Sequence, residues 1–243
     1  AYIVVMYGAV SDVYMRDVHT RMDLSFVRLW ETPDDLFNEP EPLSPFRDYW
    51  NENMGDVVRD TAQFCSGRRD LSAGGVAWVE GLCNDRSYSW VGYVGGYEEA
   101  LGGPIPSDYD VSGATHELGH NCGVYHNHDY GLDECDDPST QPKRGGIMSY
   151  CGQTFSGGKG NTDMRFETLL QDIMWAYIVD RNCIANDCNG NGVRDGLDIQ
   201  NGTSGDARWR FESGAITGTL RVRLGGKNMT FFQRVNAKPI GPC

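Results

Sequence analysis

The segment from residue 116 to residue 126 has the residue types and the spacing of a metal site that activates water. His116 and His120 are four positions apart, so a helix would place both imidazoles on one face, about one turn from each other. Glu117 then lies beside them, where its carboxylate could take a proton from a zinc-bound water. Gly123 allows the helix to end in a sharp turn, and His126 returns as the third ligand. Three neutral imidazoles leave one zinc position for water, which is typical of catalytic zinc.

The alternative is a surface helix that carries histidines by chance. Three of the five histidines in the chain occupy the required positions, together with the required Glu and Gly, so the pattern favours one catalytic zinc ion. His128 could replace a ligand or lie behind the ligands, but the spacing already assigns His126 to the third position.

Length and composition restrict the class of protein. A chain of 243 residues can hold one catalytic domain and a small appendage. The net charge of −13 argues against a nucleic-acid partner, and no run of 18 apolar residues could span a membrane. Eight scattered cysteines predict disulfides and therefore a secreted protein, extracellular or at the cell surface. The chain starts without a leading polar segment, and we expect an export signal and a pro-segment to have been removed.

Hydrophobic spacing predicts the elements that must position these residues. Residues 1–19 favour a helix, with a strand and a turn as the alternative, and the alternation in Met22–Trp30 predicts a strand. Further helices are expected over Pro45–Cys65 with Ser44 as the N-cap, over Val111–Asn121 and over Thr162–Asn182, and further strands over Gly74–Leu82 and Tyr88–Tyr97. The acidic segment from Asp129 to Lys143 is expected to be a loop, either calcium-binding or simply solvated.

Three stretches carry a resemblance to the metzincin zinc peptidases over residues 1–183. They are Val10–Asp17, the segment 116–126, and the glycine-rich segment 145–151, in which Met148 lies 22 residues after His126. The nearest subgroup is the secreted bacterial reprolysin-like (adamalysin-related) type, although Asn127 stands where the adamalysins have Asp. The resemblance implies an α+β fold with a twisted mixed sheet, whose first strand would either be missing from this sequence or be supplied by another segment.

The same resemblance gives Met148 and Tyr150 their expected roles. Met148 would lie in a tight turn, the Met-turn, that forms an apolar floor beneath the zinc. Tyr150 matches a tyrosine that lies near the metal and can hydrogen-bond the transition state, and the alternative is a buried core tyrosine. For the disulfides, Cys65–Cys83 is a plausible pair, and Cys122 could pair with Cys151 near the zinc, with Cys135 as the competing partner.

A different pattern begins after Cys183. Oxygen-bearing residues and a glycine occupy the positions of an EF-hand-type calcium loop, as in dockerin-like and thrombospondin-type repeats, with a polar turn as the alternative. The predicted calcium ligands are Asp187, Asn189, Asn191, the carbonyl of Val193, Asp195 and Asp198. Residues 184–206 would form this repeat, and residues 207–243 a short β-rich tail that could mediate self-assembly.

These patterns together predict a secreted zinc endopeptidase that acts on a protein or peptide substrate. Its cofactors would be one catalytic zinc ion and at least one structural calcium ion. The alternative function is a calcium-dependent structural or adhesive protein built on a metallopeptidase scaffold.

Overall fold

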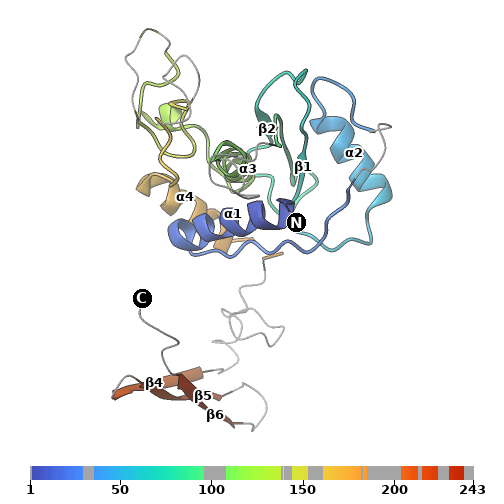
Figure 1. The fold of residues 1–243 in the computed structure, drawn as a ribbon. Coiled ribbons are helices and arrows are strands. Elements are labelled where there is room, and N and C mark those ends of the chain that lie inside the picture. Colours follow the sequence, from blue (N-terminus) through green and yellow to red (C-terminus); the bar gives the residue numbers. More distant parts are fainter. Residues whose placement is uncertain are drawn as a thin grey trace. The chain divides into compact units, whose positions relative to one another are not determined.

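The computed structural model of the chain describes residues 2–29, 36–95, 108–137, 139, 144–152, 161–181, 183–184, 204–212, 215–223 and 230–237. The chain divides into two compact units, residues 1–184 and residues 185–243. Figure 1 traces the elements of both units along the sequence.

The first unit has an α+β fold, as the sequence predicts. Its elements in chain order are α1 (Tyr2–Val18), α2 (Leu43–Asn53), β1 (Ala62–Cys65), β2 (Gly75–Ala77), β3 (Tyr88–Val91), α3 (Asp108–Asn121), the short 3-10 helix η2 (Asn127–Tyr130) and α4 (Thr168–Val179). The three strands form one mixed sheet in the order β1-β3-β2, in which β3 pairs parallel with β1 and antiparallel with β2.

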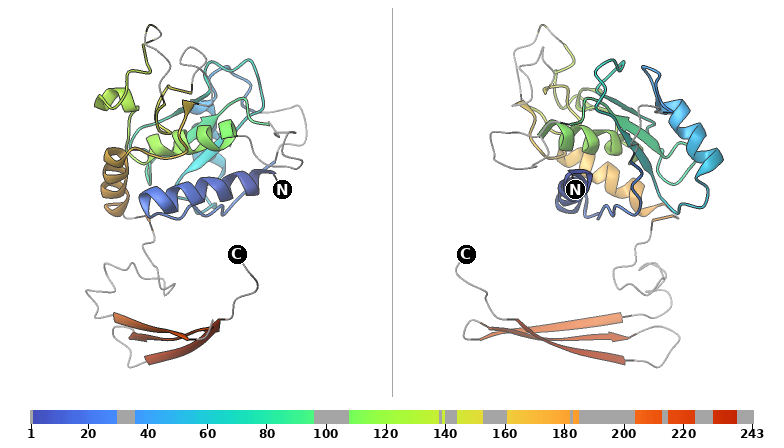
Figure 2. Two further views of the ribbon diagram at one scale, coloured as in Figure 1. Left: turned by 60° about the vertical axis from the view of Figure 1, so that its left-hand side comes forward. Right: turned by 45° about the vertical axis from the view of Figure 1, so that its right-hand side comes forward.

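Both faces of this sheet are buried. On one face, Tyr88 and Trp90 of β3 join a cluster with Phe46 of α2, and on the other face Val91 joins the cluster that α1, α3 and α4 form. Successive residues of a strand lie on opposite faces, so all four residues of β3 are buried. Figures 1 and 2 show α2 on one side of the sheet and α3, with α1 next to it, on the other side.

Helix α1 forms where the sequence favours a helix. Met6, Val10, Val13 and Tyr14 recur at helical spacing and are buried against the rest of the unit. At the end of α1 the buried carboxylate of Asp17 accepts a hydrogen bond from the amide of Phe166 (2.9 Å) and pairs with Arg16 (2.6 Å). Burial alone would raise the pKa of Asp17, but these donors outweigh it and hold the pKa below its usual value.

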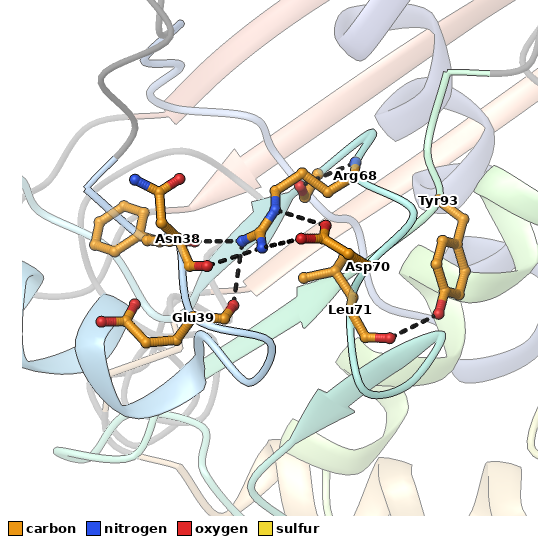
Figure 3. Close-up of polar contacts among 8 residues, drawn as sticks. Asn38, Glu39, Arg68, Asp70, Leu71 and Tyr93 are labelled. Carbon is orange, nitrogen blue, oxygen red and sulfur yellow. Dashed lines mark hydrogen bonds and ion pairs between the residues drawn. The ribbon is translucent and has the colours of Figure 1, made fainter.

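Arg68 holds the segment before α2 against the loop after β1. Its guanidinium donates to the backbone carbonyls of Phe37, Asn38 and Glu39 and pairs with both carboxylate oxygens of Asp70 (Figure 3). The five contacts use donors at all three guanidinium nitrogens, which the planar geometry of arginine permits. The carbonyl of Leu71, in the same loop, accepts a hydrogen bond from the hydroxyl of Tyr93, which follows β3 (2.9 Å).

Two predicted elements differ in the structure. No strand forms over residues 22–29, the described part of the predicted strand Met22–Trp30, and Leu24, Phe26 and Leu29 are exposed. Alternation specifies a strand only where a neighbouring strand supplies hydrogen bonds, and among the described elements none pairs with this segment. The helix predicted over 45–65 is shorter: α2 starts at Leu43 with Pro42 rather than Ser44 before it, and β1 occupies 62–65.

The disulfides also differ from the predicted pairs. The structure joins Cys83 to Cys183 and Cys135 to Cys151, whereas Cys65 and Cys122 have no disulfide partner among the described residues. The predictions Cys65–Cys83 and Cys122–Cys151 are therefore wrong, and Cys135, the competing partner, is the partner of Cys151. Cys122 is buried beside Tyr14 in the core.

In the second unit, the described residues form a three-stranded antiparallel sheet. Its strands are β4 (Ser204–Glu212), β5 (Ala215–Arg223) and β6 (Thr230–Ala237), with β5 in the middle. In the described part of the whole chain, no helix combines the length and the apolar character needed to cross a bilayer.

Candidate metal centre

Helix α3 carries the first two candidate ligands and ends directly after them. His116 and His120 lie one turn apart, with ring centroids separated by 4.9 Å. The helix ends at Asn121, and Gly123 adopts φ +98°, where its amide donates to the carbonyl of His120 (2.9 Å). A Cβ at Gly123 would lie 2.9 Å from the ring of Tyr177. Glycine is therefore required at this position for two reasons, because the backbone has a positive φ and because there is no room for a side chain.

The chain after this turn brings His126 back to the helix. Its ring centroid lies 5.2 Å from that of His116 and 4.7 Å from that of His120. The candidate ligand atoms of the three histidines all lie within 4.8 Å of one another, so they could hold one metal ion. The structure thus brings together the three residues that the spacing selects.

The hydrogen bonds of His116 and His120 leave the other nitrogen of each imidazole available to a metal. Nδ1 of His116 lies 2.7 Å from the carbonyl of Ile147, and Nδ1 of His120 lies 2.8 Å from the carbonyl of Val124. A carbonyl only accepts, so Nδ1 carries the proton and Nε2 keeps its lone pair. Nδ1 of His126 lies 3.6 Å from the carboxylate of Asp129. Such outer contacts are those that orient metal-binding histidines.

The histidines are also in the charge state that a metal requires. Burial lowers the pKa of His116 well below its usual value, and the neighbouring His120 adds to the shift. Burial likewise lowers the pKa of His120, and it lowers the pKa of His126 to about 4. At neutral pH all three imidazoles are therefore uncharged, and metal binding need not displace a proton.

Glu117 follows His116 on α3, and its carboxylate is buried. The residue is 6 % exposed, and its Oε2 has no hydrogen-bond partner among the described residues. A Cβ at Gly75 of β2 would lie 2.4 Å from Oε1 of Glu117, so a side chain at Gly75 would displace the carboxylate. Burial raises the pKa of Glu117 to about 8 in the absence of a cation. The group is suited to exchange a proton near neutral pH.

The turn at residues 145–150 lies against α3 beneath the histidines. Met148 is fully buried, and a Cβ at Gly119 would lie 2.6 Å from its sulfur. The carbonyl of Ile147 meets His116, and the carbonyl of Met148 accepts the amide of Asn127 (2.9 Å). This turn therefore holds the ring of His116 in position, and it also holds the backbone at Asn127, next to His126.

Tyr150 and His128 lie at the side of His126. The ring of Tyr150 is 4.4 Å from the ring of His126, and the ring of His128 stacks on His126 at 5.2 Å. Burial raises the pKa of Tyr150, and the charges of Glu117 and Asp129 raise it further. The hydroxyl of Tyr150 therefore keeps its proton at neutral pH and can donate it in a hydrogen bond.

The sequence patterns did not reveal three supporting residues. Asp129 accepts the backbone amide of His126 (3.0 Å) as well as lying near its ring. Asn121, fully buried, donates to the carbonyls of Trp78 and Tyr88 and so ties the end of α3 to the strands. Gly75 leaves room for Glu117. Only Asp129 has a local signal, an acid three residues after a helix cap.

The predicted calcium ligands between Asp187 and Asp198 lie outside the described residues.

The fold and the three converging histidines define a class of protein, the zinc metallopeptidases. A family model matches residues 1–127 of the chain, and its description is metallo-peptidase family M12B, reprolysin-like. The match spans more than half of the chain and includes all three histidines and Glu117, so the chain belongs to this family. Membership implies a catalytic zinc ion and a protein or peptide substrate. A comparison with curated proteins gives no match.

Proposed function

We propose that the protein is a zinc-dependent endopeptidase in which Glu117 is the general base. The observation that carries the proposal is the convergence of the three imidazoles, whose candidate ligand atoms lie within 4.8 Å of one another. The Nδ1 atoms of His116 and His120 each face a carbonyl, and the buried carboxylate of Glu117 follows His116 on the same helix. His116, His120 and His126 would hold the zinc ion. When bound, zinc acts as a Lewis acid on the peptide carbonyl and lowers the pKa of water.

Glu117 would move the proton in this reaction. Its carboxylate accepts a proton from the attacking water and then returns it to the amine that leaves. A buried carboxylate without a hydrogen-bond partner at Oε2 has a free acceptor for this proton. Gly75 leaves room for the carboxylate, because any larger residue at this position would occupy the same space.

The test uses the full chain and an unfolded casein as the substrate. We expect hydrolysis that a chelator abolishes and added zinc restores. Glu117→Gln should keep its zinc but lose activity by about 10²–10⁴-fold, the usual contribution of a general base. His120→Ala, as the matched control, should lose both zinc and activity, which metal analysis of the purified protein measures. Hydrolysis by Glu117→Gln at the rate of the unchanged chain would contradict the proposed base.

Tyr150 would stabilise the negative charge that develops on the carbonyl oxygen. The support is its position beside His126 and the raised pKa that keeps its hydroxyl protonated. Tyr150→Phe removes only the hydroxyl and should lower kcat by about 10–100-fold with little change in KM or bound zinc. A change confined to KM would instead assign Tyr150 to substrate binding.

We further propose that the protein is secreted and binds calcium. Two disulfides in the first unit support an oxidising compartment. The spacing of oxygen-bearing residues between Asp187 and Asp198 supports one calcium ion of the dockerin type. The alternating pattern of residues 204–237 supports self-association of the chain through its C-terminal strands.

A further inference from the structure

A second set of metal-binding side chains lies beside the candidate metal centre. His126, His128 and Asp129 each offer a candidate ligand atom, and the three atoms lie within 4.8 Å of one another. The carboxylate of Asp129 lies near both imidazoles, with one oxygen 3.6 Å from Nδ1 of His126 and the other oxygen 3.8 Å from Nε2 of His128. Imidazole and carboxylate are both common ligands of zinc in proteins.

The backbone of η2 holds this set together. The amide of Asp129 donates to the carbonyl of His126 (3.1 Å), and the carboxylate of Asp129 accepts the backbone amide of His126 (3.0 Å). The rings of His126 and His128 are stacked, with 17° between their planes and 5.2 Å between their centroids. All three side chains come from η2 and the residue before it, so the set forms together with this short helix.

The spacing of the three groups is close to that of ligands on one ion. Zinc lies about 2.0–2.2 Å from its nitrogen and oxygen ligands, so two ligands of a tetrahedral ion are about 3.3 Å apart. The separations of 3.6 Å and 3.8 Å in the structure are only slightly larger. The side chain of Asp129 is 45 % exposed, so its carboxylate can move the short distance that an ion requires.

We propose that His126, His128 and Asp129 form a second zinc site, which fills when zinc is in excess and then inhibits the peptidase. The two sites would share His126, because an imidazole has two nitrogens. Sharing makes the second ion the weaker one, since the ring must give up its N–H and the two positive ions repel each other.

Inhibition follows from the neighbours of this set. The second ion would draw the carboxylate of Asp129 away from its contact with His126, a ligand of the catalytic site. It would also bind to His128, whose ring lies 5.0 Å from the ring of Tyr150. Zinc binding by this set does not depend on the peptidase reaction, whereas the inhibition rests on the proposed function.

The test is the number of zinc ions that the full chain binds, measured by equilibrium dialysis against zinc chloride at fixed millimolar calcium. His128→Phe keeps an aromatic ring beside His126 and Tyr150 but removes both nitrogens. At high zinc it should bind about one ion per chain fewer than the unchanged chain, and it should keep the first, tighter ion. His19→Phe is the matched control. His19 is exposed and belongs to neither set, so this variant should bind as many ions as the unchanged chain.

Casein hydrolysis over a zinc series measures the inhibition separately. At high zinc the unchanged chain should lose about 10-fold of its maximal activity, as expected when an outer contact of a metal ligand is lost, whereas His128→Phe should keep most of its own maximum. If His128→Phe also loses the first ion, His128→Gln takes its place in both measurements.

The two measurements can fail independently. Equal numbers of bound zinc ions with and without His128 would overturn the second site. One ion fewer without relief of the inhibition would overturn its inhibitory role. A chain that hydrolyses no casein at any zinc concentration would contradict the proposed function, while the dialysis result would still decide on the second site.

Discussion

The two sides of the candidate metal centre are held by different kinds of contact. On the α3 side, His116 and His120 meet the backbone carbonyls of Ile147 and Val124, which lie in buried turns. On the η2 side, His126 depends on the carboxylate of Asp129, a side chain that is 45 % exposed. A backbone carbonyl in a buried turn moves only if the fold moves, whereas an exposed side chain can leave its partner at little cost.

This difference separates two properties of the site. Changes on the α3 side should reduce the free energy of unfolding, because Val124, Ile147 and Met148, which surround the ligands there, are part of the hydrophobic core. Changes on the η2 side should reduce metal affinity and leave the fold nearly unchanged. Three substitutions test the separation.

The largest effect is expected from Met148→Ala. Met148 is fully buried against Gly119 of α3, and truncation leaves a cavity that costs about 2–5 kcal/mol of unfolding free energy. Urea unfolding of the metal-free protein measures the change. Met15→Ala on α1, where the methionine is 43 % exposed, is the control and should cost less than about 0.5 kcal/mol. Equal costs for the two changes would show that Met148 is not part of the core.

Gly123→Ala should follow in size. The added Cβ meets Tyr177 at 2.9 Å, and φ +98° is unfavourable for alanine, so we expect a loss of about 2–4 kcal/mol. Gly131, which ends η2, has φ +69° but open space around it. Gly131→Ala should therefore cost only about 1 kcal/mol. Thermal unfolding of both variants compares the two sides directly, and the expectation fails if Gly131→Ala is the more damaging change.

Asp129→Ala should have the smallest effect on stability. It removes the acceptor near Nδ1 of His126 and the acceptor of its backbone amide. Loss of such an outer contact usually weakens metal binding by about 10–100-fold, and we expect about 10-fold weaker zinc binding here. Competition with a zinc-sensitive dye measures the affinity, and urea unfolding of the metal-free form should change by less than about 1 kcal/mol. A large loss of stability with unchanged zinc affinity would reverse the assignment of Asp129.

The sequence predicted the α3 side of the site better than its surroundings. His116, Glu117 and His120 lie within one helical segment, so their mutual placement depends only on the period of the helix. Helix α1 was predictable for the same reason, from the spacing of its buried residues. The contact between Gly75 and Glu117 joins positions 42 residues apart, and nothing in local spacing could indicate it.

The segment from Met22 to Leu29 shows why the rest could not be predicted. Its alternation satisfies the pattern of a strand, but a strand also requires a partner that supplies hydrogen bonds. The disulfide pairs could not be predicted for the same reason, since they too depend on partners that are distant in the sequence. Cys83 pairs with Cys183 across 100 residues, and only the packing of the unit brings the two thiols together.

That same disulfide decides how the catalytic unit would bear a mechanical load. Cys183 is the last cysteine before residues 185–243, so tension applied to the second unit reaches Cys183 first. From there the covalent path leads to Cys83, whose loop is hydrogen-bonded to Asp60 and, through Leu82, to Asn121 at the end of α3. The force is therefore transmitted to the sheet and to α3, the helix that carries the histidines. It does not pass through α4, so α4 is not pulled away from the core.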